Sequence, residues 1–566
     1  MKICIWASLT GLLLWACLAQ GATQVLLSNH VIPMTKPHQK QGLPMAIVVQ
    51  DGLIQWMGEK SDLPIFLQEH PEQSVQSIDL GDQAVLPGFI DAHGHATFTA
   101  LGTQLANVAS PPVGPSRDIG DLQTALRLYI AEKQIQPGEW VVGMGYDDSL
   151  LTQRRHPNRD DLDQVSVDHP IMLMHVSGHL ATANSKALAR IGYSSETPDP
   201  PGGHIRRRPD SREPNGVLEE SATGPLRRYM QAANRNPVAS VREAIKVYAS
   251  HGITTIQDGA ASPEVIALLQ AAAVQGALTV DVIAYPWGMV QPDQIIKGYE
   301  YGRYNAGLKI GGVKLSLDGS PQGKTAYLSE PYHVPPHGQT PAYRGYPSVS
   351  EAVAHDLIEK YLDAQIPIIV HANGDAAAQV LIDGVAAARP QHDHRTVMIH
   401  AQTVREDQLT RMKGLRMIPS YFSAHTFYWG DWHRDSVLGP ERGARISPTA
   451  STVSRGMPFT VHNDAPIVPP DMIRLLWATT NRLTRSGKIL GKEQRISTYQ
   501  ALLAMTYYAA YQSFEETTKG SLEVGKRADF VVLSNDPLTT PIDRLLDLRV
   551  THTFVTGQLV YTAPTE

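Results

Sequence analysis

Residues that can bind a metal ion recur at the ends of apolar segments in this chain. His93 and His95 follow the run LPGFIDA, whereas His371, His400 and Asp464 end or follow the runs IPIIV, TVMI and PFTV. Residues two apart in a strand point to one face, so we expect the imidazoles of His93 and His95 to face the same side. Any single histidine among the 22 is more simply explained as a surface or core residue, but buried polar groups without partners are costly, so the whole set carries the inference. Imidazole nitrogens and a carboxylate oxygen are the donors that zinc takes in an open catalytic site, and we predict that these five residues hold zinc or a similar divalent ion.

A lysine lies on another of these segments. Lys314 is in GGVKLSLDG, and strand alternation turns its side chain to the same interior. An ammonium group beside metal ions is repelled, and desolvation among cations lowers a lysine pKa and makes the free amine reactive. We therefore expect one of two outcomes: a carbamate formed by addition of CO₂, which bridges two metal ions, or a neutral or salt-bridged Lys314 that orients Asp318.

The elements that position these residues alternate between apolar strands and amphipathic helices. After the opening strand we expect seven more, at residues 252–259, 278–287, 311–319, 366–375, 396–402, 415–422 and 458–466. Helical stretches such as EAVAHDLIEKYLDA lie between them, which is typical of parallel strands with crossover helices. We predict an α/β fold, a (β/α)₈ TIM-like barrel, in which reactive groups lie at the C-terminal ends of the strands.

The barrel is expected to be interrupted once and flanked on both sides. Residues 86–514 form the predicted metal-dependent barrel, and the segment of about 101–250 after its first strand is too long for a crossover, so we expect an inserted subdomain over the barrel mouth. Short strands and turns recur in residues 23–85 and 515–566. Neither half can bury a face alone, so we predict that both termini build one small composite β-sandwich domain.

The first 22 residues have the composition of a signal peptide. Lys2 precedes an apolar run, and Ala19 to Gly21 offer a small-residue cleavage site. We predict an exported protein, periplasmic or secreted, with a lipid anchor on Cys17 as the alternative to ordinary cleavage. Both cysteines, Cys4 and Cys17, lie in this segment, so we expect no disulfide in the mature chain.

Composition narrows the choice of partners. The 566 residues carry a formal net charge of -6, 42% are hydrophobic and no long basic run occurs, which argues against nucleic acid as a partner. After the first 22 residues no segment approaches the length of an apolar membrane span, so we expect no stable transmembrane segment in the mature chain. A small-molecule substrate is the expected partner, and a homo-oligomer stays open.

Several motifs together resemble the amidohydrolase superfamily, specifically amidohydrolase family 3, the branch of N-substituted formamide deformylase-like proteins. They are LPGFIDAHGH, GGVKLSLDG, VHANGDAA, MIHAQ, HNDAP and the closing GSLEVGKRADFVVL, and the resemblance covers nearly the whole mature chain. It extends to GEWVVGMGYDDSLL, VSGHLATANSKAL and PNGVLEE in the predicted insertion. The resemblance implies one metal ion on His93 and His95, a second on His371 and His400, carboxylated Lys314 as the bridge, and Asp464 as a ligand and proton shuttle.

Two positions depart from the family pattern. The family often has Glu before the histidine of the sixth strand, where this chain has Ile399. It often has Ser before the aspartate of the eighth strand, where this chain has Asn463, preceded by His462. The ligand atoms survive both changes, so metal binding is still implied, while the orientation of the ligands and the substrate preference become open.

The resemblance implies a hydrolase of a non-peptide carbon–nitrogen bond, in an amide, formamide or carbamate, that uses metal-activated water. Asp464 would take a proton from the water and pass it to the departing nitrogen, since an amine is otherwise a poor leaving group. His179 in the insertion is the candidate for support of the carbonyl oxygen, with a structural role beside Asn184 as the alternative.

Three further residues are candidates for the substrate site. Tyr146 and Asp147 either line the pocket or set a turn beside neighbouring glycines. Tyr428 belongs to the aromatic stretch SYFSAHTFYWGDWH, which either walls an aryl substrate or packs beneath the insertion.

Other functions stay open at this stage. A mononuclear hydrolytic deaminase needs a carboxylic acid near the fifth-strand ligand, and Asp375 follows His371 by four residues. An esterase or lactonase with a carbamate lysine is a third possibility, although such barrels usually lack the split β-sandwich. Outside enzymes, the alternative is a non-catalytic exported binding protein on the same scaffold.

Overall fold

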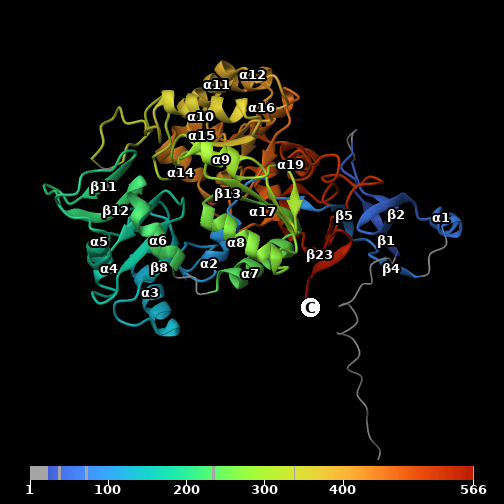
Figure 1. Ribbon diagram of the computed structural model, residues 1–566, viewed down its shortest axis with the longest axis horizontal. Helices are drawn as coiled ribbons and strands as arrows, with labels where there is room; N and C mark the ends of the chain where they lie inside the picture. Colours follow the sequence, from blue (N-terminus) through green and yellow to red (C-terminus); the bar gives the residue numbers. More distant parts are fainter. Residues whose placement is uncertain (1–22, 36–39, 71–73, 233–235, 337, 565–566) are drawn as a thin grey trace, which may run out of the picture.

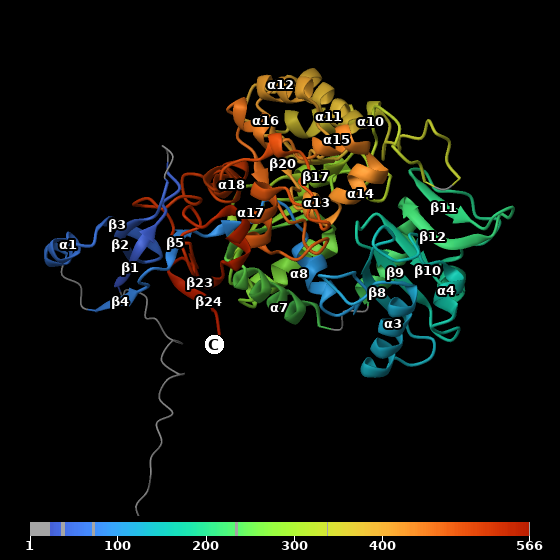
Figure 2. The same ribbon diagram turned by 180° about the vertical axis from the view of Figure 1, so that it is seen from behind.

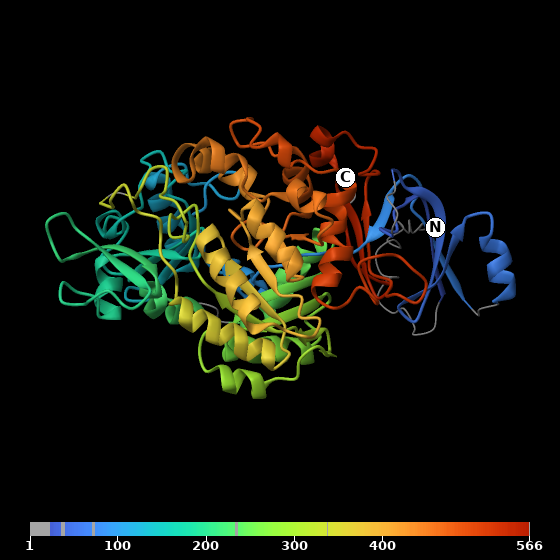
Figure 3. The same cartoon turned by 90° about the horizontal axis from the view of Figure 1, so that it is seen from above.

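The computed structural model describes residues 23–35, 40–70, 74–232, 236–336 and 338–564. The predicted signal peptide, with Cys4 and Cys17, lies outside these residues. Among the helices in the described ranges, none combines the length and the apolar character that crossing a bilayer requires. The chain forms a central α/β unit with a β-rich unit at each end (Figure 3).

The central unit contains two sheets whose strands follow chain order. One sheet pairs β6, β13, β14 and β16 in parallel, and the other pairs β17, β18, β19, β20 and β21 in parallel. Their bounds are β6 Phe89–Ile90, β13 Ile253–Ala261, β14 Asp281–Pro286, β16 Leu308–Ile310, β17 Val313–Ser316, β18 Ile368–Ala372, β19 Val397–His400, β20 Ile418–Tyr421 and β21 Thr460–Val461. Each predicted segment therefore holds a strand, and the strand expected at 311–319 is preceded by a separate short strand, β16.

Backbone hydrogen bonds join the two sheets at both edges. The N–H of Gly288, just after β14, donates to the carbonyl of Lys314 in β17 over 2.8 Å. At the other edge the N–H of Asp464 donates to His93 over 3.1 Å, and the N–H of His95 donates to Ala465 over 2.8 Å. The residues that directly follow β6 and β21 are thus hydrogen-bonded to each other.

Helices cover the strands of the central unit. They include α7 Pro237–Ser250, α8 Pro263–Val274, α10 Glu351–Asp363, α11 Asp375–Ala388, α12 Glu406–Gly414, α17 Met472–Asn481 and α18 Thr498–Met505. In α10 the side chain of Ser350 caps the helix by accepting the N–H of Val353 over 3.4 Å, and the buried residues recur on one face with helical spacing. The strands, in turn, are buried along their whole length because helices lie against them.

The two ends of the described chain share one eight-stranded sheet. Its strands are β1 Thr23–Val31, β2 Leu43–Gln50, β3 Leu53–Glu59, β4 Val75–Asp79, β5 Ala84–Pro87, β22 Phe530–Leu533, β23 Val550–Val555 and β24 Gln558–Thr562. β5 and β22 pair antiparallel, from Ala84 opposite Leu533 to Pro87 opposite Phe530. The blue and red segments accordingly lie side by side (Figures 1 and 2). Because β5 runs almost directly into β6, this sheet anchors the short strand that ends just before His93 and His95.

A six-stranded sheet lies between β6 and β13 in the chain. It is ordered β11, β12, β10, β9, β8, β7, with bounds β7 Ala106–Asn107, β8 Val141–Tyr146, β9 Ile171–His175, β10 Leu180–Ala183, β11 Gly203–Arg207 and β12 Pro214–Glu220. We call it the insertion sheet; it lies at the opposite end of the molecule from the terminal strands (Figures 1 and 3). The last part of the predicted insertion, α7, instead packs against α2 (Ala96–Gly102) and β13 of the central unit.

Candidate metal centre

Two imidazoles converge on one carboxylate oxygen after strands β6 and β21. Nδ1 of His95 lies 2.6 Å from the carbonyl oxygen of Gly259, and Nδ1 of His93 lies 3.3 Å from Oε1 of Gln257. Only an N–H can donate to these oxygens, so in the neutral form of each ring Nε2 keeps its lone pair. The two Nε2 atoms lie 3.7 Å (His93) and 3.2 Å (His95) from Oδ1 of Asp464. With both rings neutral, the two nitrogens and the carboxylate oxygen are acceptors that face one another, and a divalent cation would satisfy all three.

The Asp464 carboxylate also has an oxygen that a cation would satisfy. Its Oδ1 is buried and accepts no hydrogen bond from any described residue. The ligand atoms of His93, His95 and Asp464 lie within 4.8 Å of one another, close enough to share one ion. Asp464 also has a backbone φ of +56°, which is uncommon for a residue with a side chain and is found where surroundings fix a functional group. We take these observations as evidence that the residues present fit a divalent metal ion.

Lys314 lies directly beside this trio. Its Nζ is 3.0 Å from Nε2 of His93, and the residue is only 3% exposed. Burial lowers the pKa of Lys314 to about 7, although the charge of Asp464 opposes the shift. In the alternative prediction Lys314 orients Asp318. The carboxylate of Asp318 instead accepts backbone N–H groups from Tyr327 and Asn373, each over 3.0 Å. Lys314 thus faces the metal ligands, as strand alternation predicts.

A second pair of imidazoles meets beside the first. Nδ1 of His371 and Nε2 of His400 are 3.0 Å apart. Nε2 of His371 lies 3.0 Å from the carbonyl of Gly319, and Nδ1 of His400 lies 3.2 Å from Nε2 of His462, whose Nδ1 contacts Oγ of Ser420 over 2.8 Å. These outer contacts turn the two facing nitrogens toward one point, where either a shared proton or a metal ion satisfies both.

The charges around the imidazoles keep them neutral. Burial lowers the pKa of His93, His371 and His400 well below the usual value, and neighbouring positive groups add to the effect. Neutral imidazole is the form that binds metal ions. These three imidazoles are therefore in the form that binds metal ions near neutral pH.

All six predicted metal-binding residues line one cavity of about 470 Å³. The rest of its lining mixes polar residues, among them Arg227, Asp258 and Glu264, with an apolar wall formed by Phe98, Leu101, Met174, Met230, Leu268 and Trp287. A volume of this size holds a small organic molecule. The cavity thus combines a polar floor for chemistry with an apolar wall for binding.

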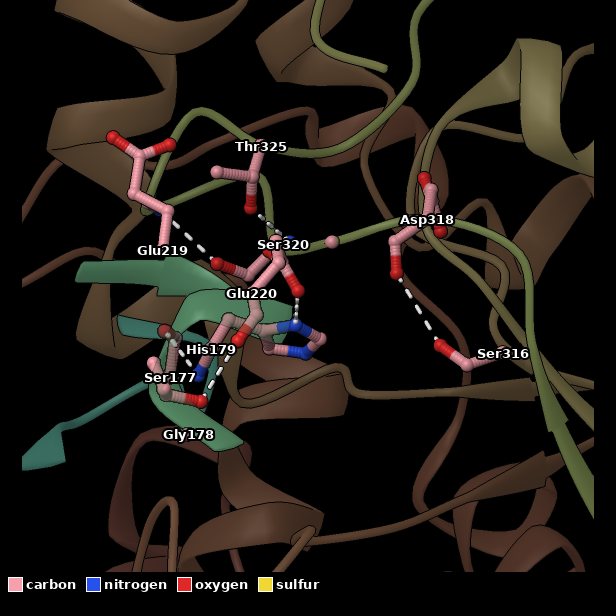
Figure 4. Close-up of polar contacts among 12 residues, drawn as sticks. Ser177, Gly178, His179, Glu219, Glu220, Ser316, Asp318, Ser320 and Thr325 are labelled. Carbon is pink, nitrogen blue, oxygen red and sulfur yellow. Dashed lines mark hydrogen bonds and ion pairs between the residues drawn. The ribbon is translucent and has the colours of Figure 1, made fainter. Parts of the chain in front are cut away.

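His179 reaches this cavity from the insertion sheet. Its Nδ1 contacts Oε2 of Glu220 over 2.8 Å (Figure 4), and its ring centroid is 5.1 Å from that of His371. Burial lowers the pKa of His179, but the ion pair with Glu220 outweighs it and the pKa lies above the usual value. Asn184 instead caps helix α5 (Ser185–Ile191) by accepting the N–H of Ala187 over 2.9 Å.

Tyr146 lies away from this cavity. It is fully buried, and its hydroxyl contacts Oγ1 of Thr182 over 3.0 Å and Nδ1 of His156 over 3.2 Å. These partners belong to the interior of the insertion.

Asp147 and Tyr428 line a different cavity, of about 250 Å³. Oδ2 of Asp147 accepts the indole N–H of Trp429 over 2.6 Å, and Ile467 is shared with the larger cavity. The substrate roles of Tyr146, Asp147 and Tyr428 stay predictions.

Three residues that contact candidate site residues were not predicted from the sequence: two contact candidate metal ligands, and one contacts His179. Gln257 lies in the predicted strand GITTIQDG, where alternation could have placed it inward. His462 was visible two residues before Asp464, but its contact with His400 depends on how β19 and β21 approach each other. Glu220 contacts His179 although the two are 41 residues apart in the sequence, and no local sequence pattern predicts that contact.

Comparison with known proteins defines the class. A model of the amidohydrolase family matches residues 76–561, so the chain belongs to the amidohydrolase family. It is 26% identical over 540 residues to an N-substituted formamide deformylase of Arthrobacter pascens, across 91% of this chain and 94% of that protein. It is also 26% identical over 547 residues to protein LONG AFTER FAR-RED 3 of Arabidopsis thaliana, across 92% of this chain and 89% of that protein.

A solved structure shares the fold. The crystal structure of an uncharacterized metal-dependent hydrolase from Pyrococcus horikoshii ot3 superposes with a TM-score of 0.70 at 22% identity, covering 92% of this chain and 99% of that chain. The predicted α/β architecture of the TIM-barrel hydrolase type is confirmed at this level. The predicted enzyme class, a hydrolase of non-peptide carbon–nitrogen bonds, is confirmed by the family.

Proposed function

We propose that this protein hydrolyses small N-substituted amides, with formamides and carbamates as the nearest classes, at a zinc centre. The observation that carries the proposal is the convergence of two imidazole lone pairs on the Oδ1 atom of Asp464, which no described donor satisfies. The similarity to a formamide deformylase supports the choice of bond. The apolar wall of the cavity supports a substrate with a hydrocarbon or aryl group on nitrogen.

The ligands divide into two groups. His93, His95 and Asp464 would hold one ion, and His371 with His400 would hold a second, with a carbamate on Lys314 between them. The buried amine of Lys314, whose pKa is about 7, supports carbamate formation because a substantial share of it is neutral and nucleophilic at neutral pH. A bound divalent ion supplies Lewis acidity, which lowers the pKa of water and polarises a carbonyl.

The side chains perform the proton transfers and the orientation. Asp464 accepts the proton of the attacking water through its carboxylate and delivers it to the departing nitrogen, so that an amine leaves rather than an amide anion. His179 donates from its ring to the carbonyl oxygen as negative charge develops there, and its ion pair with Glu220 supports a protonated donor. The apolar wall orients the substituent on nitrogen and excludes bulk water from the reacting bond.

The deaminase alternative is less well supported. The acid that it requires, Asp375, accepts the N–H of Ser329 over 2.9 Å and a guanidinium N–H of Arg405 over 2.8 Å. Asp375 is not among the residues that line the 470 Å³ cavity. The described residues therefore favour an amide over a ring amidine as the substrate.

The proposal includes the finer architecture and the location. We propose that the two central sheets close into one eight-stranded barrel, which the hydrogen bonds from Gly288 to Lys314 and from Asp464 to His93 support. The terminal sheet would form the composite domain of residues 23–85 and 515–566. The first 22 residues would direct export to the periplasm or beyond, with a lipid on Cys17 as the variant form.

The test combines metal analysis with an amide panel. Protein purified with zinc and bicarbonate should contain up to two equivalents of metal and should hydrolyse at least one of formanilide, acetanilide and ethyl N-phenylcarbamate. A chelator should abolish the turnover, and Zn²⁺ should restore it. Metal-loaded protein that hydrolyses none of the panel would contradict the proposal and favour the binding-protein alternative.

A further inference from the structure

The contact between His179 and Glu220 is built into the pairing of two strands in the insertion. β10 begins one residue after His179, and β12 ends at Glu220. The strands pair antiparallel, with Leu180 opposite Glu219, and the N–H of Glu220 donates to the carbonyl of His179 over 2.8 Å. The relative position of the two side chains is therefore set by a backbone ladder rather than by a loose loop.

The Glu220 carboxylate has one side-chain hydrogen-bond partner among the described residues. Its Oε2 accepts from Nδ1 of His179 over 2.8 Å, while its Oε1 is buried and has no hydrogen-bond partner within the described chain. The backbone of Glu220 has a φ of +49°, which is costly for a residue with a side chain. A buried oxygen without a donor and a strained backbone both cost stability. Such features are found mainly at functional sites, where the surrounding structure holds them in place.

Glu220 also contacts the loop that holds a metal ligand. A Cβ atom on Gly319 would lie 2.4 Å from Oε1 of Glu220, so the loop approaches the carboxylate as closely as only a glycine allows. The carbonyl of the same glycine lies 3.0 Å from Nε2 of His371. Figure 4 shows the Glu220 carboxylate and the His179 ring turned toward each other beside the segment that carries Asp318. The insertion pair thus docks against the part of the central unit that orients His371.

The neighbouring carboxylate provides a contrast. Glu219 accepts from Nε of Arg206 and from the hydroxyl of Tyr346, the latter over 3.2 Å. Successive residues of a strand point to opposite faces, so Glu219 and Glu220 serve different sides of the sheet. Glu219 lines a separate cavity of about 450 Å³ rather than the metal centre.

We propose that Glu220 is a positioning residue that acts through His179. By holding Nδ1–H of His179, it turns the opposite ring nitrogen to the cavity and keeps it where the carbonyl oxygen of the substrate arrives. This proposal rests on the proposed amide hydrolysis, in which His179 donates to the carbonyl oxygen of the substrate as that oxygen becomes negatively charged. Removing a group that orients a catalytic side chain costs activity about 10–100-fold in comparable metal sites, without requiring a change in substrate affinity.

A double-mutant cycle tests the proposal with the panel amide that the wild-type enzyme turns over fastest. We expect Glu220→Ala to lower kcat about 10–100-fold with KM changed less than about threefold. Glu220→Gln should retain part of the rate, because the amide oxygen still accepts from Nδ1. His179→Ala should be at least as slow as Glu220→Ala, and the double variant no slower than His179→Ala, since Glu220 then has nothing left to orient. Multiplying effects in the double variant, or a wild-type kcat in Glu220→Ala, would overturn the proposal.

Glu219→Gln is the matched control. It removes a buried carboxylate charge one residue away, so it should lower the thermal midpoint while leaving kcat near the wild-type value. A fall in kcat equal to that of Glu220→Ala would show that any damage to this sheet slows the enzyme, and would contradict a specific role for Glu220.

Crystal structures of the wild type and of Glu220→Ala decide the matter without turnover. We expect one well-defined orientation of the His179 imidazole in the wild type and a rotated or divided one in the variant, with the metal ligands unmoved. A His179 ring that stays in place in Glu220→Ala would overturn the positioning role even in an active enzyme. A wild type that binds metal and shows the ordered ring, yet hydrolyses no amide, would instead place the failure in the proposed function.

Discussion

Two clusters in this molecule bring histidine and aspartate together at the same spacing. In each, three possible ligand atoms lie within 4.8 Å of one another: His93, His95 and Asp464 at the end of the central strands, and Asp147, Asp148 and His175 in the insertion. By proximity alone both qualify as metal sites. Their hydrogen bonds distinguish them.

In the insertion cluster the contacts already satisfy the ligand atoms. Nε2 of His175 pairs with Asp148 over 3.0 Å, and Nδ1 of His175 contacts Oγ of Ser177 over 2.8 Å. Asp147 accepts from the N–H of Ser149 over 2.9 Å and from the indole of Trp429 over 2.6 Å. This is a closed network, which stabilises the insertion and leaves nothing for a cation to do.

In the central cluster the same kinds of group are arranged so that hydrogen-bond acceptors face one another. The Nδ1 atoms of His93 and His95 are occupied by acceptors, and their Nε2 atoms face a carboxylate oxygen that no described donor reaches. For this reason we propose the central cluster, with its unsatisfied acceptors, rather than the insertion cluster as the metal site.

The largest expected effect is on Asp464. Asp464→Asn keeps the shape of the side chain but removes the base that carries the proton to the leaving nitrogen. We expect kcat on the best panel amide to fall roughly 10²–10⁴-fold, the range typical of a lost general acid–base. Steady-state kinetics on protein of measured metal content would check this, and activity within about tenfold of the wild type would remove Asp464 from the chemistry.

Substitution of one histidine in each cluster tests the comparison itself. His95→Ala should weaken zinc binding at least about 10–100-fold, because one of three converging donors is lost. His175→Ala removes an equally buried imidazole from the insertion cluster and should leave the zinc content unchanged. Chelator competition measures both, and equal losses of metal would mean that the two clusters do not differ as their hydrogen bonds indicate.

The insertion cluster should instead respond in stability. Asp148→Asn removes the charge that pairs with His175 at 3.0 Å and lies 3.6 Å from Nε2 of His156. We expect a loss of about 1–3 kcal/mol in the free energy of unfolding, the usual cost of breaking a largely buried charged contact. Urea unfolding of metal-loaded protein measures it. A loss of bound metal without a loss of stability would reverse the assignment.

A smaller effect concerns pH. Burial lowers the pKa of His93, His371 and His400, so these ligands stay neutral below the pH at which an ordinary histidine, with a pKa near 6.5, takes up a proton. Proton competition should therefore begin only at lower pH, and zinc affinity should change less than about threefold between pH 7.5 and 6.0 for this reason. Competition titrations at the two pH values on Lys314→Met protein, which lacks the amine whose pKa is about 7, would test it, and a drop of ten-fold or more would show that the imidazoles are protonated in the ordinary range.

The sequence predicted the central strands and where the candidate ligands lie along them because both signals are local. An apolar run that ends in His371 or His400 predicts both a strand and an imidazole at its C-terminal end. Parallel strands bring such ends to the same edge of the sheet. The same logic placed Lys314 inward, where it contacts His93.

What the sequence could not predict depends on contacts between distant segments. The pairing of His179 with Glu220 depends on the register of β10 and β12, and the contact of His462 with His400 depends on strands that are not neighbours in the sheet. Tyr146 was expected in a loop, but it ends strand β8, and its hydroxyl turns to Thr182 within the insertion rather than to the cavity. Side-chain type indicates what a residue can do, and long-range packing decides where it does it.

The most direct test is anomalous X-ray diffraction at the zinc edge from crystals of the zinc-loaded protein. The account predicts a strong peak between His93, His95 and Asp464, within bonding distance of their Nε2 and carboxylate atoms, and no peak between Asp147, Asp148 and His175. An empty central cluster, or a peak confined to the insertion cluster, would contradict it.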